Sequence, residues 1–362
     1  MERALILSIG NNIGLTRLPG VLRAWGLEVH VCSDDRGHVL HSAHIAERHL
    51  CPREAEPRRR YLEELLARPW DRIIPGDDIA LRFLVDDGRP DFLAALPVDL
   101  ARVGPAVVRD KGAFTRWILT TELPTPRTAI ATSAAEAAAW WTSSGLGRVL
   151  LKPLEGQGGV GIFVPSSEAH LREQWPESTG AMLVQEFVTG PTFVAEWLME
   201  HGEVRGLVLS RKTRARGAFG FSTERAYAAP APAEALAREV GRLTGFHGFG
   251  GADLIQRPDG SLAILEIRFR PTSCLHWTAL GGCDFARVLR GEPAATPIDP
   301  GPHPLFPELV STELVRAGAP AALRQLLSPR LWRRMSWNDR GALARHWWKV
   351  HREWKRRGDS PS

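Results

Sequence analysis

The dipeptide Asp259-Gly260 separates two apolar segments and strongly limits how this chain can fold. Asp-Gly favours the backbone of a two-residue turn, so it predicts an antiparallel β-hairpin. With such a turn, Asp253 and Glu266 lie directly opposite each other, with β-carbons about 5 Å apart. A one-residue bulge at Pro258 would break this pairing.

Two facing carboxylates repel each other, and burial strengthens the repulsion. A divalent cation between them would remove this cost, and oxygen ligands suit Mg2+. Arg268 and Arg270 follow Glu266 at the two-residue spacing of a strand, so we expect all three on one face. The alternative is a solvated face with ordinary salt bridges. The strand's other face is strongly apolar, which favours the buried arrangement.

A glycine-rich segment, "KPLEGQGGVGIFV" (residues 152–164), begins just after one apolar run and ends in another. Its backbone N–H groups, with Lys152 at the base, would suit a polyphosphate. It is not a P-loop, because the lysine precedes the glycines and no Lys-Ser/Thr follows. Taken alone, a glycine hairpin without a ligand is the simpler interpretation.

The N-terminal part alternates strands and helices, which predicts a parallel sheet. The expected strands are 4–9, 28–32 and 71–76, and the expected helices are 15–25 and 58–67. The first turn has the spacing GxxxG, so the dinucleotide-binding fingerprint is absent. Asp34 or Asp35 could bind a ribose, although acids are common in such loops. A nicotinamide-dependent oxidoreductase is therefore disfavoured.

A new pattern begins near Pro105. Ser133 and Glu136 form a capping box that opens a helix through Trp141. The later elements are a strand over 181–188, strands over 193–199 and 203–211 joined at His201-Gly202, and a helix over 232–243. Two weaker metal candidates lack a complete ligand set. They are Cys274 with His276 and Cys283, and the histidines His38, His41, His44 and His49.

With 362 residues, the chain is long enough for two or three domains. It has no apolar run that could span a bilayer, and its start lacks the pattern of a signal peptide. Four cysteines without a CxxC pair favour reduced thiols, so we expect a cytoplasmic protein.

The net charge of +5 comes from the C-terminal tail. Residues 330–359 hold ten Lys/Arg and three Asp/Glu, and Leu343, Trp347, Val350 and Trp354 share one helical stripe. Such a stripe could lie on a membrane surface or RNA, but docking on the parent domain or a second subunit is favoured. We expect no nucleic acid partner and allow for a homodimer.

The glycine-rich loop and the carboxylate hairpin, in this order and about 100 residues apart, resemble the ATP-grasp superfamily. The resemblance covers roughly residues 1–290. It implies a mixed α/β and α+β fold of four parts. These are a Rossmann-like domain (1–105), a central subdomain with the glycine-rich flap (106–185), a C-terminal subdomain with the metal hairpin (186–295), and a basic, Trp-rich helical extension (296–362). The two middle parts would clasp ATP.

The resemblance also implies site residues. Those expected to bind ATP are Lys111, Lys152, Gly156, Gly158, Gly159, Gln185, Glu186, Phe187, Val188 and Thr192. Lys111 and Lys152 match phosphate contacts, Gln185 would meet the adenine amino group, and the backbone of residues 187–188 would meet the ring. D-alanine–D-alanine ligases and their relatives commonly have a ribose-binding glutamate at the position of Thr192. Asp253 and Glu266 match the two Mg2+ ligands.

Arg270 matches the arginine of the family's Glu-x-Asn-x-Arg motif, but Arg268 stands where that motif has asparagine. A guanidinium cannot coordinate a metal. Two interpretations follow. In the first, Arg268 supplies positive charge near the γ-phosphate or binds a substrate carboxylate; in the second, the site has lost catalytic power. We favour the first. In the basic loop 210–222, Arg211, Lys212 and Arg214 are further candidates for an anionic substrate or the γ-phosphate, with a solvated loop as the alternative.

The function implied by the resemblance is an ATP-dependent ligase that joins a small-molecule carboxylate to an amine through an acylphosphate. Its cofactors would be ATP and Mg2+, and Arg268 and Arg270 its catalytic residues. The alternative is an ATP-binding regulatory or structural protein with a degenerate site.

Overall fold

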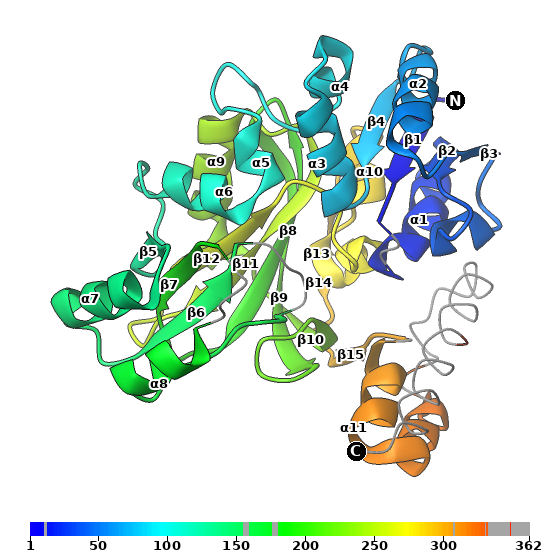
Figure 1. Cartoon of the computed structure of the whole chain (residues 1–362). Helices are drawn as coiled ribbons and strands as arrows, with labels where there is room; N and C mark the ends of the chain where they lie inside the picture. The colour runs from blue at the N-terminus through cyan, green and yellow to red at the C-terminus, as the bar shows by residue number, and fades with distance from the viewer. Residues whose placement is uncertain are drawn as a thin grey trace.

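The computed structural model describes residues 1–10, 13–154, 159–175, 180–306, 308–329, 331 and 348. Three main sheets follow one another along the chain (Figure 1). The stripe of the tail, Leu343, Trp347, Val350 and Trp354, lies outside the described residues. Among the described residues, no helix is both long and apolar enough to cross a bilayer.

The N-terminal sheet is parallel, with the strand order β3-β2-β1-β4, which confirms the predicted alternation. Its strands are β1 (Arg3–Ser8), β2 (Glu28–Ser33), β3 (Glu47–Leu50) and β4 (Arg72–Pro75). Its helices are η1 (Ile13–Arg17), α1 (Leu18–Ala24), η2 (His38–His41), α2 (Ala55–Leu66), α3 (Asp78–Asp87) and α4 (Pro90–Ala94). The predicted helix 15–25 is thus a 3-10 turn followed by a short α-helix.

The second sheet is antiparallel, with the order β5-β7-β6. Its strands are β5 (Thr128–Ala131), β6 (Val149–Pro153) and β7 (Met182–Glu186). Its helices are α7 (Ala134–Ser144) and α8 (Glu168–Gln174), and α5 (Ala106–Arg109) and α6 (Lys111–Ile118) precede it. Ser133 caps α7 by accepting from the Glu136 N–H, as predicted. After the glycine-rich segment the chain returns to pair Phe163 with Leu151.

The third sheet has six strands in the order β12-β11-β8-β9-β10-β15. They are β8 (Thr192–Glu200), β9 (Glu203–Ala215), β10 (Ser222–Ala228), β11 (Gly248–Gln256), β12 (Leu262–Arg268) and β15 (His303–Pro304). Helix α9 (Ala231–Thr244) packs on one face of this sheet. The other face contacts η3 (Leu275–Leu280), β13 (Gly281–Cys283) and α10 (Phe285–Leu289).

The β11–β12 hairpin confirms the predicted pairing of Asp253 with Glu266 but not the predicted turn. The turn has three residues, 258–260, because Arg257 donates its N–H to the Ser261 carbonyl. Gly260 has a φ of 87°, the left-handed conformation that ends such a turn. A bulge farther along then shifts the pairing by one residue, between Asp253 and Leu254. The two irregularities cancel, so the two carboxylates still face each other.

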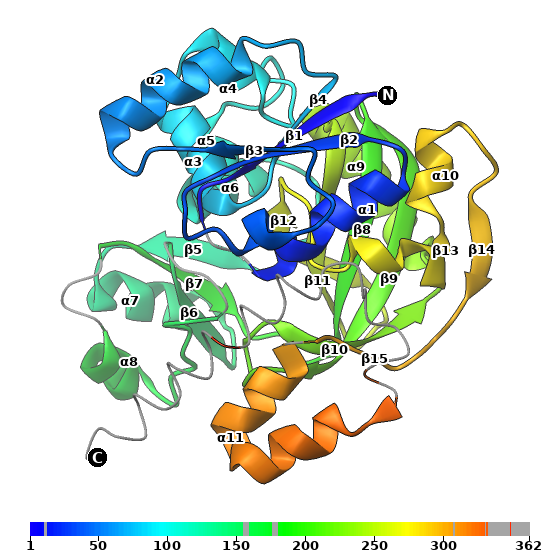
Figure 2. The same cartoon turned by 90° about the vertical axis from the view of Figure 1, so that its right-hand side faces the viewer.

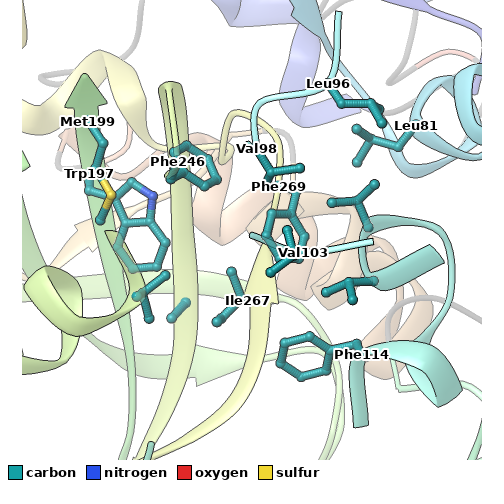
Figure 3. Packing of buried hydrophobic residues seen from close by; sticks show 14 of the residues in the cluster. Leu81, Leu96, Val98, Val103, Phe114, Trp197, Met199, Phe246, Ile267 and Phe269 are labelled. Atoms are coloured by element: carbon teal, nitrogen blue, oxygen red, sulfur yellow. The ribbon is translucent and has the colours of Figure 1, made fainter. Parts of the chain in front are cut away.

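The largest core joins the N-terminal domain to the third sheet. Figure 3 shows Leu81 and Leu96 of the N-terminal part on one side and Trp197 and Phe246 on the other, with Phe269 between them. All five side chains are buried. The parallel N-terminal sheet is therefore packed directly against the sheet that carries the carboxylate hairpin.

The segment after residue 295 is not helical throughout. It begins with β14 (Ala295–Ile298) and β15, and helix α11 (Glu308–Leu326) follows, with a break at Gly318. Figure 2 shows α11 beside β10 and β15. Both Nη atoms of Arg17 donate to the Glu308 carboxylate, at 3.0 and 2.7 Å, and both side chains are buried. This ion pair anchors α11 to the N-terminal domain.

Asp77 makes the stability of this fold depend on pH. Its carboxylate accepts from the N–H groups of Ala80 and Gly10, both at 2.9 Å, and so holds the start of α3 near the end of β1. Burial raises the pKa of Asp77 from 3.8 to about 6. The folded state therefore binds this proton more tightly than the unfolded chain does.

We expect the contribution of Asp77 to stability to be complete below about pH 4 and to be lost as the pH rises through about 6. Urea unfolding of wild type and Asp77→Asn across this range would measure it. The advantage of wild type should shrink by up to about 3 kcal/mol between pH 4 and pH 7. A difference that stays constant over this range would show that the Asp77 pKa is not raised by folding.

Candidate active site

Four of the predicted site residues line one pocket between the second and third sheets: Lys111, Lys152, Gln185 and Glu266. They come from α6, β6, β7 and β12. The remaining lining residues are mainly apolar or carry hydroxyl groups, and they are Phe114, Thr115, Ile118, Leu119, Thr125, Thr128, Leu183 and Leu265. An apolar wall with two lysines and one carboxylate offers both a surface for a flat ring and charges for phosphate and metal.

Lys111 is positioned by the cap of its own helix. Asp110 accepts a hydrogen bond from the Ala113 N–H at 2.7 Å and thereby fixes the start of α6, where Lys111 is the first residue. Burial lowers the pKa of Lys111, while the nearby charge of Glu266 acts in the opposite direction. The charges of Lys111, Lys152 and Glu266 are thus near enough to influence one another.

At the end of β7 and just after it, three residues that were predicted to bind ATP instead make contacts within the protein. Gln185, which lines the pocket, donates to the Thr128 hydroxyl at 2.9 Å. The Glu186 carboxylate pairs with Arg257 at 3.1 Å. The Phe187 N–H donates to the Arg148 carbonyl at 3.1 Å. A ligand at this link would therefore meet the Phe187 carbonyl or the Val188 backbone, rather than the Phe187 N–H.

The glycine-rich segment is described only in part, since Gly156 and Gly158 lie outside the described residues. Gly159 has a φ of 79°, and a β-carbon there would lie 2.3 Å from the Phe219 carbonyl oxygen. Only glycine fits this position. The end of the flap therefore contacts the loop between β9 and β10. Gly159, Val188 and Thr192 are not among the residues that line the pocket.

Asp253 is held by two cations on the face of the sheet that carries Glu266. Arg268 donates to one carboxylate oxygen of Asp253, and the Lys212 ammonium lies 3.0 Å from the other. Burial alone would raise the pKa of Asp253, but Arg268 and Lys212 hold it well below its usual range. In return, Asp253 raises the pKa of Arg268 above its ordinary value. The positive charge that the facing carboxylates need is supplied here by two side chains.

This arrangement affects the fit of Mg2+ at the two predicted ligands. Glu266 lines the pocket and presents the type of oxygen that Mg2+ prefers. Each oxygen of Asp253 already contacts a cation, so a metal ion bound there would lie close to the positive charges of Lys212 and Arg268. The donor set thus fits a cation held mainly by Glu266.

Arg270 does not line the pocket but links two domains. Its guanidinium donates to both oxygens of Asp78, at 2.6 and 2.9 Å. Burial alone would raise the pKa of Asp78, but Arg270 holds it below the ordinary value. Asp78, the partner of Arg270, was not among the site residues predicted from the sequence. A usable signal was present, because Asp78 follows the carboxyl end of β4, where parallel sheets commonly bind ligands.

The basic loop candidates separate in the structure. Lys212 pairs with Asp253, whereas Arg214 pairs with Glu313 of α11 at 2.8 Å. Arg211 lies opposite Phe193 in the sheet. The two metal sets suggested by sequence, Cys274–His276–Cys283 and the four histidines, do not form a cluster of three or more ligands in the described part of the chain.

Known proteins share this domain and this fold. A family model described as the ATP-grasp domain matches residues 108–274. No curated protein sequence matches the chain. The L-amino acid ligase from Bacillus licheniformis superposes with a TM-score of 0.57 at 17% identity, covering 82% of this chain and 75% of that one.

The ADP complex of PurK, an N5-carboxyaminoimidazole ribonucleotide synthetase, gives 0.61 at 14% identity over 83% of this chain and 80% of that one. Biotin carboxylase from Campylobacter jejuni gives 0.58 at 12% identity over 80% and 71%. These similarities confirm the predicted mixed α/β fold. Residues 108–274 of this chain are therefore an ATP-grasp domain.

Proposed function

We propose that this protein is an ATP-dependent ligase that joins a small, amino-acid-like carboxylic acid to an amine. The observation that carries the proposal is the convergence of Lys111, Lys152, Gln185 and Glu266 on one pocket between two sheets. The similar L-amino acid ligase supports an amino-acid-like acid.

Each lining residue has a chemical role in this proposal. Gln185 and the apolar wall would bind adenine, and Lys111 and Lys152 would neutralise phosphate oxygens. Glu266 would hold Mg2+, whose charge would stabilise the phosphates when bound. The bidentate contact between Arg270 and Asp78 would fix the end of β12 relative to the N-terminal domain.

The reaction would proceed in two steps, formation of an acylphosphate and attack by the amine. A carboxylate oxygen of the acid attacks the γ-phosphorus of ATP, the bond to the β-phosphate oxygen breaks, and ADP leaves. The amine nitrogen then attacks the acyl carbon, phosphate leaves, and the proton lost by nitrogen passes to phosphate or solvent. Arg268, on the face that carries Glu266, would place fixed positive charge near the transferring group.

A second function is favoured by one specific contact. Asp253 is already paired with Arg268 and Lys212, and these three residues resemble a structural ion cluster as much as part of a metal site. On this alternative the protein binds ATP for a regulatory or structural purpose and does not turn it over. Release of ADP that requires both an acid and an amine would distinguish a ligase from such a binding protein.

We expect Mg2+ with ATP to raise the melting temperature of wild type, because ligand binds only the folded state. Lys152→Ala should weaken ATP binding by roughly 10- to 100-fold, since a hydrogen bond to a charged group contributes about 1.5–3 kcal/mol. Thermal shifts over a nucleotide titration measure this loss. Arg238→Ala is a suitable control, because Arg238 is exposed on α9 and pairs with Glu234 of the same helix. If Lys152→Ala responds to ATP as wild type does, Lys152 does not bind phosphate.

A further inference from the structure

A second group of ligand-forming side chains lies at the edge of the N-terminal sheet, in the adjacent strands β2 and β3. His30 of β2 is opposite Glu47 of β3, and His49 follows Glu47 by two residues, so all three share one side of the sheet. None of the three lines the pocket that contains Lys111 and Glu266. One ligand atom from each of the three lies within 4.8 Å of the others.

The distances match those around a small tetrahedral metal ion. His30 Nδ1 lies 3.2 Å from His49 Nε2 and 3.4 Å from Glu47 Oε2. Zinc bonds to nitrogen and oxygen are about 2.0–2.1 Å, which places neighbouring ligands about 3.3 Å apart. His30 Nδ1 therefore has a suitable separation from each of the other two ligand atoms.

Carboxylates lie beside the second ring nitrogen of each histidine, and the one beside His30 is within hydrogen-bond distance. His30 Nε2 lies 2.9 Å from Glu28 Oε1, so it is the nitrogen that carries the proton, and Nδ1 presents a lone pair. His49 Nδ1 lies 3.6 Å from Glu47 Oε1. With its proton on Nδ1, His49 also presents a bare nitrogen, which faces His30. Two lone pairs 3.2 Å apart need either a shared proton or a metal between them.

The two rings are enclosed by the protein, while the carboxylate is accessible to solvent. Both histidines are buried, and Trp70 packs edge-on against each ring. Glu47 is exposed at the edge strand, so the fourth position of a metal is open to water.

We propose that His30, His49 and Glu47 bind a divalent transition metal of the zinc class, with water as the fourth ligand. Nitrogen ligands make Mg2+ a poor occupant, which separates this site from any magnesium bound with nucleotide. The metal would join the edge strand β3 to β2. The carboxylate of Glu28, bound to His30, follows the pattern of carboxylates that orient metal-binding histidines.

The test uses the full chain without an affinity tag, in excess Mg2+. Zinc is titrated against a chromophoric chelator, and cobalt is followed by its visible absorption. Wild type should bind one tight equivalent and give a tetrahedral cobalt spectrum without a thiolate charge-transfer band. His49→Gln should weaken binding about 100-fold or more, and Glu47→Gln at least about 10-fold. Glu47 is exposed, so its variant should fold even if His49→Gln does not.

His201→Asn is the matched control, because His201 and His247 also form a stacked pair, with ring centroids 4.4 Å apart, but belong to no cluster of three ligand atoms in the described part of the chain. Asparagine tolerates the positive φ of 48° at this position. This variant should bind zinc as wild type does. Three results would overturn the proposal: no stoichiometric zinc binding by wild type, unchanged binding in Glu47→Gln, or a thiolate band that places cobalt on cysteines.

Discussion

Replacing Glu266 by glutamine is expected to lower ligase turnover by about 100-fold or more while the protein stays folded. Among the described residues, Glu266 is the one carboxylate that lines the pocket together with Lys111 and Lys152. Glutamine keeps the size of the side chain but removes its charge, so a cation bound at the phosphates would be held less tightly. Loss of charge stabilisation at a transferring group typically costs a few kcal/mol.

ADP release measured with an acid and an amine present would check this expectation, with circular dichroism and thermal unfolding as tests of folding. Glu292→Gln is a matched control, because Glu292 pairs with Arg290 at the surface and does not line the pocket. Raising Mg2+ should partly restore Glu266→Gln if its defect is weak metal binding. A Glu266→Gln protein with near-wild-type turnover would exclude Glu266 as a metal ligand.

The site could be predicted in part because strand alternation and turn chemistry act locally. The pairing of Asp253 with Glu266 was predicted correctly, although through a turn of the wrong length. The three-residue turn and the bulge each shift the register by one, in opposite directions. A turn signal in the sequence therefore determines which residues pair farther along a hairpin only when the strands between them are regular. The bulge in this hairpin was not apparent from the sequence.

Contacts between distant parts of the chain could not be predicted in this way. The pairing of Arg270 with Asp78 spans 192 residues and depends on how two sheets pack. The same holds for Arg17 and Glu308, which are 291 residues apart. Local periodicity places each of these residues on an element, but the packing of shared cores decides which charges meet. The core around Phe269 and Leu81 brings Arg270 to Asp78, and the core that contains Leu18 and Leu305 brings Arg17 to Glu308.

The contact made by Arg268 was also not predicted from local sequence patterns. Replacing this residue is expected to have the second large effect on turnover. The sequence placed Arg268 on the face of Glu266, but its contact with Asp253 depends on the bulge and on Lys212 reaching across from β9. We expect Arg268→Asn to lower turnover by about 100- to 1,000-fold, since a fixed donor to a developing charge typically contributes about 2.7–4 kcal/mol. ATP affinity should change much less, because Lys111, Lys152 and Gln185 remain.

The ion pair makes a second variant necessary, since Arg268→Asn also leaves a buried carboxylate with Lys212 as its remaining cation. Removing one member of a buried pair is itself destabilising. The double variant Arg268→Asn/Asp253→Asn removes both charges, so it should recover stability without recovering turnover if Arg268 acts on the transferring phosphoryl group. Turnover and ATP affinity measured side by side in wild type, single and double variants would separate these effects. If Arg268→Asn instead gains ATP hydrolysis that wild type lacks, the freed Asp253 is acting as a metal ligand, and the wild-type site is one that the arginine holds inactive.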